Sequence, residues 1–304
     1  MLNNPSSYEP VGGKLPRNCC LAAENDYDGT GRASNRGVFF TSFQKGNFEM
    51  RRVATIISVV ALIWAMPVVS MAQLVKPAEG KHAANTGNPK LDKDGRTIQK
   101  GFEDRHNKFN ERIKQGNVDL VFIGDSITDA WSGPGKPIWN ERYTPRNAVN
   151  LGIGGSRAQH VIWRLQNGNL AGVEPKVAVV MIGTNNSNGK DHTAQEIGEG
   201  IVEVVKTIEQ KSPKTKVLLL AIFPRGEKPN PQREKNDEAS AIAAKSLADD
   251  KQATFLDIGP KFMADDGTIS KDIMPDLLHL SPKGYQIWAD AIEPKLKELL
   301  GEKS

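Results

Sequence analysis

Cysteine is nearly absent from this 304-residue chain, whose only two cysteines are the adjacent Cys19 and Cys20. Adjacent cysteines rarely bridge each other, and no third cysteine offers a distant partner. The sequence therefore excludes a disulfide framework, a cysteine-based zinc site and a thiol nucleophile with a matched histidine. The fold must depend on its core, and hydrophobic residues make up 38% of the chain.

Long runs of one charge sign are also missing. The 40 Lys and Arg residues are interspersed with 36 Asp and Glu residues, which leaves a formal net charge of +4. Such mixing is typical of a solvated surface, whereas nucleic-acid-binding proteins gather basic residues into a stripe or patch. We expect no nucleic-acid partner.

The N-terminal part of the chain has the pattern of an export signal placed after a non-globular stretch. Residues 1–49 are rich in Asn, Gly, Ser and Pro and show no helical or strand period. Met50-Arg51-Arg52 then precedes the apolar run 53–69, and Ser70-Met71-Ala72 supplies a small-residue cleavage pattern. This order predicts a secretory signal peptide over 50–72, with export to the periplasm or the medium.

Signal peptides begin a chain, so we interpret Met50 as the true start and residues 1–49 as a gene-model artefact. The alternative is a genuine tail followed by a membrane anchor, for which the apolar run is short. No cysteine follows the run, so lipidation is not expected. Residues 73–97 are polar, with Pro, Gly, Asn and Lys, and are interpreted as a linker.

From residue 98 the pattern becomes that of an α/β domain spanning 98–304. Apolar residues at helical spacing predict a first helix over about 98–115. Short β-branched runs follow, typical of buried parallel strands, at 118–123, 148–151, 177–182, 217–222 and 254–256. Helical patterns separate or follow them at about 158–167, 193–210, 236–250 and 283–300. This alternation predicts a sheet of about five parallel strands with helices on both faces.

Ligands of open α/β sheets bind beyond the carboxyl ends of the strands. The loops after the first three runs carry Gly124-Asp125-Ser126, Gly152-Ile153-Gly154-Gly155 and Gly183-Thr184-Asn185-Asn186. Ser126 follows a strand and can open a helix, where backbone amides favour developing negative charge. On its own, Ser126 could equally be an ordinary helix cap, and Asp125 is expected to hold this turn by local hydrogen bonds.

A serine nucleophile needs a base, and His279 is the best placed of the five histidines. It precedes the last predicted helix, with Asp276 three residues earlier, close enough to orient an imidazole. The alternative is a structural histidine near a helix start, because Ser281-Pro282 has the pattern of a helix cap. Gly155 and Asn185 could donate to an oxyanion, or could simply be turn residues.

Taken together, these segments resemble the SGNH, or GDSL-type, hydrolase superfamily. The four motifs are Gly124-Asp125-Ser126, Gly155 within 150–155, Asn185 within 183–186, and Asp276-x-x-His279. Segments 152–165, 224–236 and 266–270 further resemble the catalytic subunits of platelet-activating-factor acetylhydrolase IB. The resemblance covers about residues 100–300.

The resemblance implies a three-layer flavodoxin-like fold and a serine esterase without metal or cofactor. It implies Ser126 as nucleophile, His279 as base and then acid, and Asp276 as its orienter. The Ser126 amide, the Gly155 amide and the Asn185 side chain would form the oxyanion hole. Subunits of the similar enzymes pair, so a homodimer is expected.

Substrate expectations depend on where the chain departs from its relatives. The similar catalytic subunits lack an export signal, and exported relatives often remove acetyl groups from carbohydrates. We therefore expect acetyl esters on a sugar or polysaccharide, with a lipid acetyl ester as the alternative. Trp131 is kept as a weak substrate-binding candidate, although most buried tryptophans are core residues.

Two further alternatives belong to other classes. Gly124-Asp125 with Asp129, and the segment 183–186, faintly resemble metallophosphoesterase motifs. Such enzymes need several His and carboxylate ligands around two metals, and their Asp-x-His and Gly-His-x-His pairs are missing here. A carbohydrate-binding protein that kept the fold without turnover is the non-enzyme alternative.

Overall fold

The computed structural model describes residues 83–303, and the predicted signal peptide and residues 1–49 lie outside them. Five parallel strands form one sheet in the order β2-β1-β3-β4-β5. Their bounds are β1 Leu120–Gly124, β2 Ala148–Gly152, β3 Val177–Met181, β4 Lys216–Leu220 and β5 Ala253–Leu256. All five predicted strands are confirmed, and no boundary differs from its predicted position by more than two residues.

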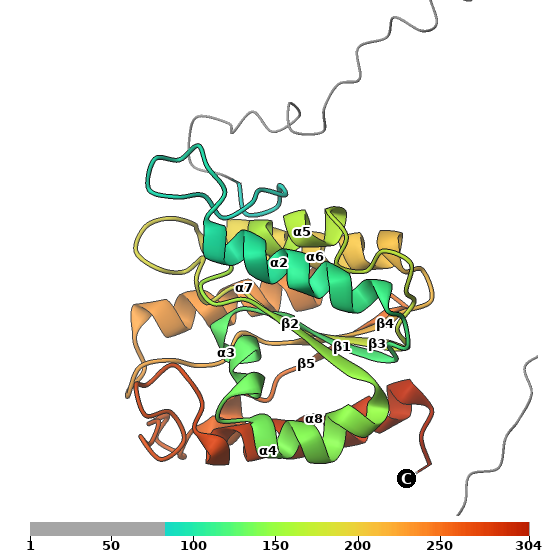
Figure 1. Ribbon diagram of the computed structural model, residues 1–304. Coiled ribbons are helices and arrows are strands. Elements are labelled where there is room, and N and C mark those ends of the chain that lie inside the picture. The colour runs from blue at the N-terminus through green and yellow to red at the C-terminus, as the bar shows by residue number, and fades with distance from the viewer. Residues whose placement is uncertain (1–82, 304) are drawn as a thin grey trace, which may run out of the picture. The chain divides into compact units, whose positions relative to one another are not determined.

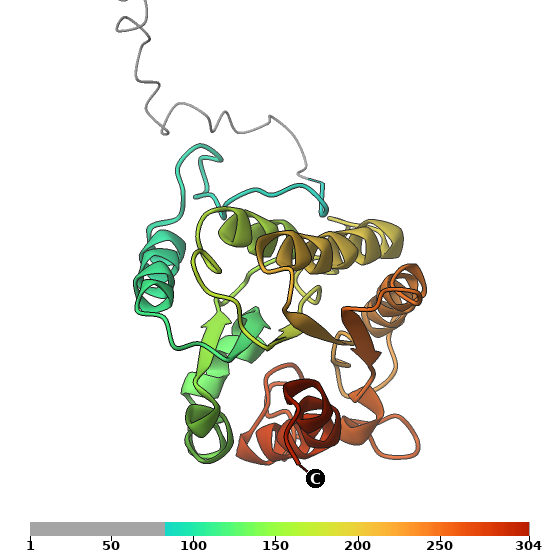
Figure 2. The same ribbon diagram turned by 90° about the vertical axis from the view of Figure 1, so that its right-hand side faces the viewer.

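Helices cover both faces of the sheet, as Figures 1 and 2 show. The longer ones are α2 Lys100–Lys114, α5 Ala158–Gln166, α6 Ala194–Lys211, α7 Pro231–Ser246 and α8 Pro282–Leu300. Short helical turns fill the β1–β2 connection and follow β5: α3 Ser126–Asp129, Ala130–Ser132, α4 Lys136–Ile138, Trp139–Tyr143, Thr144–Arg146 and Gly259–Phe262. The predicted three-layer α/β fold is therefore confirmed.

Each face of the sheet has its own hydrophobic core. Val121 and Ile123 of β1 point into the cluster that α5, α6 and α7 cover. Leu120 and Phe122 point the other way, into the cluster beneath α8. Alternate side chains of a strand face opposite sides, so a strand covered on both faces is apolar throughout.

One helix begins earlier than its apolar pattern suggests. The sequence predicts a helix over 236–250, but α7 begins at Pro231. The Asn230 side chain accepts hydrogen bonds from the Gln232 and Arg233 amides, and Pro231 occupies the first helical position. An Asn cap followed by proline starts a helix without any apolar residue, because the cap satisfies exposed amides.

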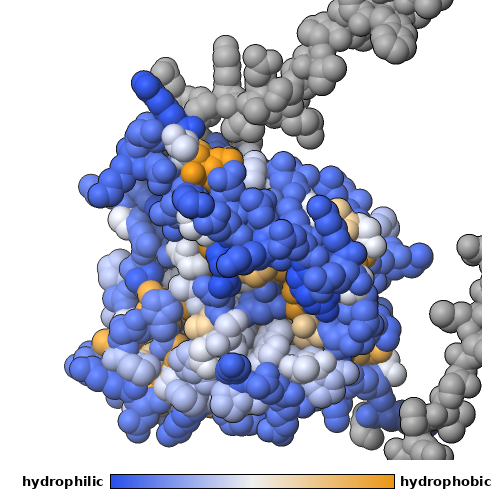
Figure 3. Space-filling view, in the orientation of Figure 1, coloured by the Kyte–Doolittle hydropathy of each residue, from blue (hydrophilic) through white to orange (hydrophobic). Residues whose placement is uncertain are grey.

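No helix among residues 83–303 is both long and apolar enough to cross a membrane. The face in Figure 3 is dominated by hydrophilic residues, with hydrophobic ones in small separate groups.

Candidate active site

Ser126 lies just beyond the carboxyl end of β1, which runs between β2 and β3, and it is the first residue of α3. Asp125, fully buried, caps this helix: its Oδ1 accepts the Ile127 amide over 3.0 Å. α3 lies close against the end of β2, since a Cβ on Gly152 would come within 2.2 Å of the Asp129 amide nitrogen. The predicted local role of Asp125 is confirmed, and Ser126 stands partly exposed at the strand end.

Three side chains line up at this position. The Nε2 atom of His279 lies 2.9 Å from the Ser126 hydroxyl oxygen. Its Nδ1 atom lies 2.6 Å from Oδ2 of Asp276. An imidazole that donates from Nδ1 to a carboxylate leaves Nε2 free to accept the serine proton. The geometry is that of a Ser-His-Asp triad.

The loop that carries Asp276 and His279 is held by backbone contacts. Leu277 between them has a φ of 63°, a left-handed conformation that is strained for a bulky residue. Its carbonyl accepts the Gly226 amide over 2.8 Å, and its amide donates to Met274 over 2.9 Å. After the loop, Ser281 caps α8 and Pro282 takes the first helical position, as predicted. These hydrogen bonds hold the loop, and with it His279, in position.

Asp276 is suited to remain ionised beside the imidazole. Burial alone would raise the pKa of its carboxyl group, but hydrogen bonds from the His279 side chain and from the His279 and Leu278 amides lower it below its ordinary value. Oδ1 accepts both amides, at 2.7 Å from His279 and 3.1 Å from Leu278. A carboxylate fixed in this way orients the ring and stabilises an imidazolium.

The expected oxyanion donors lie on the neighbouring loops. Gly155 has a φ of 69°, which a glycine adopts without cost. A Cβ on Gly154 would lie 4.0 Å from the Ser126 Cβ, so this loop runs beside the serine. Asn185, after β3, donates from Nδ2 to the Ser156 carbonyl over 3.0 Å, which leaves its second N–H available.

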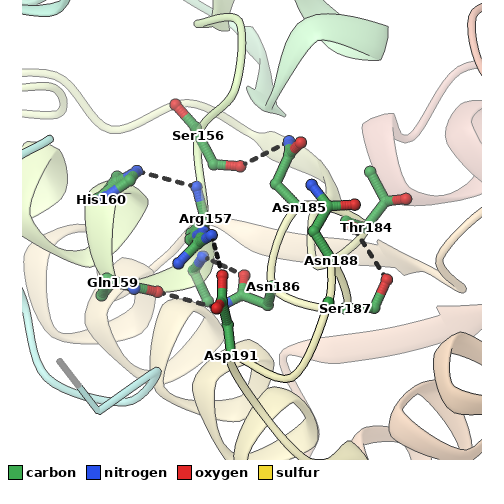
Figure 4. A network of polar contacts seen from close by, with 12 residues as sticks. Ser156, Arg157, Gln159, His160, Thr184, Asn185, Asn186, Ser187, Asn188 and Asp191 are labelled. Carbon is green, nitrogen blue, oxygen red and sulfur yellow. Dashed lines mark hydrogen bonds and ion pairs between the residues drawn. The ribbon is translucent and has the colours of Figure 1, made fainter. Parts of the chain in front are cut away.

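Polar contacts join the loops after β2 and β3 into one unit, drawn in Figure 4. Asn186 accepts the Ala158 amide over 2.9 Å and donates to Gln159 over 2.9 Å. Arg157, after β2, forms an ion pair with Asp191, after β3. The network fixes the position of Asn185 relative to the glycine loop.

A buried carboxyl group and a buried guanidinium lie under the site. Burial raises the pKa of Asp125 to about 6, although the Ile127 amide and the charges of His279 and Arg225 oppose the rise.

Burial, with Arg105 nearby, lowers the pKa of Arg164 to about 9. Arg164 donates to the Leu151 carbonyl at 2.5 Å and the Gly124 carbonyl at 3.2 Å, which joins the ends of β2 and β1.

The prediction that Trp131 contacts substrate is wrong. Its side chain is fully buried and packs against a cluster of rings, with its centroid 4.5 Å from Tyr285 and 5.0 Å from Trp288. Trp131 follows α3 in sequence, but the turn directs it into the core beneath α8. Its role is packing.

Two cationic residues near the site were not predicted. Arg225, after β4, donates to the Thr184 hydroxyl at 3.2 Å and to Asn188 at 3.1 Å, and the Asp125 and Asp276 charges act on it. Lys90 donates to the Gly154 carbonyl at 3.2 Å. The position of Arg225 shortly after a predicted strand could have indicated a residue of the site. Lys90 lies in the predicted linker, where no sequence pattern indicates such a role.

Within residues 83–303, no group of three or more His, Cys, Asp and Glu side chains is arranged to hold a metal ion. The two-metal site of a metallophosphoesterase requires such a group. That alternative therefore has no ligand set in the described part of the chain.

Much of the chain is similar in sequence to known proteins. The GDSL-like lipase/acylhydrolase family matches residues 122–287, more than half of the chain. The human platelet-activating factor acetylhydrolase IB subunit alpha1 is 41% identical over 197 residues, covering 65% of this chain and 83% of the relative. The rat alpha1 subunit is 39% identical over 226 residues, covering 74% and 93%.

A solved structure from Streptococcus pneumonia, a candidate platelet activating factor, has a similar fold. Its TM-score is 0.55 at 24% identity, and the match covers 64% of this chain and 92% of that one. At this identity the likeness concerns the fold alone. With the family match and the curated relatives, the conclusion is that this chain belongs to the GDSL-like lipase/acylhydrolase family and is a carboxylic ester hydrolase.

Proposed function

We propose that the protein hydrolyses short-chain esters, acetyl esters in particular, through an acyl-enzyme on Ser126. The observation that carries this proposal is the position of His279, within hydrogen-bond distance of both Ser126 and Asp276. A serine hydroxyl becomes a useful nucleophile only when an oriented base can take its proton.

The reaction follows from these contacts. The Ser126 Oγ attacks the ester carbonyl carbon while its proton moves to Nε2 of His279. The carbonyl oxygen becomes an oxyanion, which the Ser126 and Gly155 amides and Asn185 stabilise. His279 then gives the proton to the departing alcohol, and the acyl group stays on Oγ. A water molecule then attacks the acyl carbon while its proton moves to Nε2 of His279. The bond between the acyl carbon and Oγ breaks, His279 returns the proton to Oγ, and the carboxylic acid leaves.

The short acyl chain is proposed because the similar curated proteins are named acetylhydrolases. A series of 4-nitrophenyl esters from acetate to palmitate tests it. We expect kcat/KM to be highest for acetate or propionate, and an optimum at long acyl chains would contradict the proposal.

For the alcohol half, we propose O-acetylated carbohydrate, in keeping with the export that the segment 50–72 predicts. A lipid acetyl ester is the second candidate, supported by the names of the relatives. Acetate release from acetylated xylan, compared with release from 1-alkyl-2-acetyl-glycerophosphocholine at equal enzyme, distinguishes them. Preference for the lipid would overturn the carbohydrate proposal.

Export and pairing remain proposals of their own. Intact-mass measurement of protein recovered from medium or periplasm should give an N-terminus near Gln73, and a mature start far from it would contradict export by this signal. Light scattering of the purified protein should report a homodimer, and a monomer would contradict pairing. A non-catalytic carbohydrate-binding protein would bind acetylated sugar but release no acetate from any small acetyl ester.

A further inference from the structure

The side chain of Lys90 reaches the glycine loop beside Ser126. Its Nζ donates to the Gly154 carbonyl over 3.2 Å. A Cβ built on Gly155 would lie only 2.8 Å from the same Nζ. The ammonium group therefore lies against the peptide unit that joins Gly154 to Gly155.

The backbone around Lys90 is anchored, although the sequence predicts a linker there. The Asn88 amide donates to the Gln159 carbonyl of α5 over 3.0 Å, and the Gln99 amide donates to the Lys90 carbonyl over 2.8 Å. Leu91 and Ile98 form an antiparallel bridge. Contacts on both sides of Lys90 thus fix its position relative to the glycine loop.

The direction of the peptide unit decides what Lys90 can do. In a trans peptide the carbonyl and the N–H point in opposite directions. Lys90 binds the carbonyl end, so it lies away from the Gly155 N–H that would face the oxyanion. The hydrogen bond of Lys90 goes to the Gly154 carbonyl, so Lys90 acts on the peptide whose N–H would face the oxyanion.

We propose that Lys90 is a positioning residue that orients and polarises the Gly154–Gly155 peptide for oxyanion stabilisation. A cation at the carbonyl oxygen draws electron density toward that oxygen and strengthens the N–H at the other end as a donor. The inference rests on the proposed acyl-enzyme chemistry, in which the Gly155 amide is one oxyanion donor.

The charge around Lys90 supports this role. Within residues 83–303, no carboxylate lies within ion-pair distance of its ammonium group, whereas Arg157 nearby is paired with Asp191. The Lys90 charge is therefore directed at the Gly154 carbonyl without a neutralising partner.

Kinetics of Lys90→Met, Lys90→Arg and the matched control Lys93→Met test the proposal. Lys93 is an exposed lysine three residues along the same segment. We expect Lys90→Met to lower kcat for 4-nitrophenyl acetate about 10-fold, less than the roughly 100-fold typical of losing a whole donor. KM should stay within about two-fold, because the effect exists only when the oxyanion forms. Lys90→Arg should recover most of kcat, and Lys93→Met should behave as wild type.

A spectroscopic measurement separates polarisation from a general change in structure. Lys90→Met should move the Gly155 amide ¹⁵N resonance upfield, while Lys93→Met leaves it in place. Thermal unfolding checks that each variant is folded, and Lys90→Gln replaces Lys90→Met if the latter is not. A kcat within two-fold of wild type, a loss confined to KM, or an unchanged Gly155 resonance would overturn the inference.

A failure of the proposed acyl-enzyme reaction gives a different result from a failure of the Lys90 inference. If Ser126→Ala retains wild-type hydrolysis, the acyl-enzyme proposal fails whatever Lys90 does. The Gly155 resonance needs no turnover, so it reports on Lys90 in either case.

Discussion

The Nε2 atom of His279 lies 2.9 Å from the Oγ atom of Ser126, although 153 residues separate them in the chain. The parallel sheet brings them together, because Ser126 follows the carboxyl end of β1, an inner strand of the sheet, and His279 precedes the last helix, α8. Neither residue is informative by itself, and the contact between them is what makes Ser126 a candidate nucleophile.

Replacing Ser126 with alanine should lower kcat/KM for 4-nitrophenyl acetate by at least about 10³-fold, because no other group can form the acyl-enzyme. Ser246→Ala is the matched control, since Ser246 is an exposed serine on α7. We expect the control to keep wild-type activity. A ten-fold or smaller loss in Ser126→Ala, with the fold intact, would contradict the assignment.

Asp276→Asn should keep the loop but lose the negative charge beside Nδ1 of His279. The amide cannot stabilise an imidazolium and favours the wrong tautomer, so kcat should fall by roughly 10²- to 10⁴-fold. Steady-state kinetics beside the control Asp265→Asn, at an exposed aspartate, measure the effect. Equal activity of the two variants would remove Asp276 from the proposed triad.

Asn185→Ala should lower kcat for the same ester by about 10²- to 10³-fold and change KM little, because its free N–H acts only on the oxyanion. The comparison is Asn188→Ala, on the same loop, whose Oδ1 accepts from Arg225 and Gln232 instead. We expect a much smaller loss there. If both variants lose activity equally, Asn185 supports the loop and does not stabilise the oxyanion.

Asp125 should make the stability of the protein depend on pH. Burial raises its pKa to about 6 from 3.8, so between these values the folded protein keeps a proton that the unfolded chain has lost. The free energy of unfolding contributed by this group therefore falls as pH rises through that window, by about 3 kcal/mol in total.

Asp125→Asn tests this dependence because asparagine cannot ionise but can still accept the Ile127 amide. Urea unfolding at pH 4 and pH 7 should show the variant gaining about 2 kcal/mol relative to wild type at the higher pH, since part of the roughly 3 kcal/mol is already lost at pH 4. Parallel pH dependence in the two proteins would show that Asp125 is already ionised near pH 4.

His106 should make the free energy of unfolding fall as the pH falls, which is opposite to the effect of Asp125. Burial, and then the Arg164 charge, lowers its pKa to about 4 from 6.5, so the folded protein resists its protonation. Stability from this group should be lost as pH falls from about 6.5 toward 4, by roughly 2 to 3 kcal/mol. His106→Gln should be less sensitive to acid over that range in urea unfolding. Equal loss in both proteins would contradict the prediction.

The sequence by itself determined the features that depend on neighbouring residues. Buried parallel strands must be apolar on both faces, so all five could be located from short β-branched runs. Asp276 and His279 are close in the chain, and Ser281-Pro282 is a local cap, so the His279 loop could also be interpreted. The apolar period does not reach the start of α7, which the local Asn230-Pro231 cap sets several residues before the first apolar repeat.

Only the tertiary structure decided the contacts between distant segments. Periodicity does not show into which layer the turn after α3 directs Trp131, and the packing of α8 places it in the core. Lys90 reaches Gly154 across 64 residues from a stretch without any periodic pattern. Such contacts depend on the order of the strands in the sheet and on the conformation of the loops at the strand ends. Local sequence propensities determine neither of these.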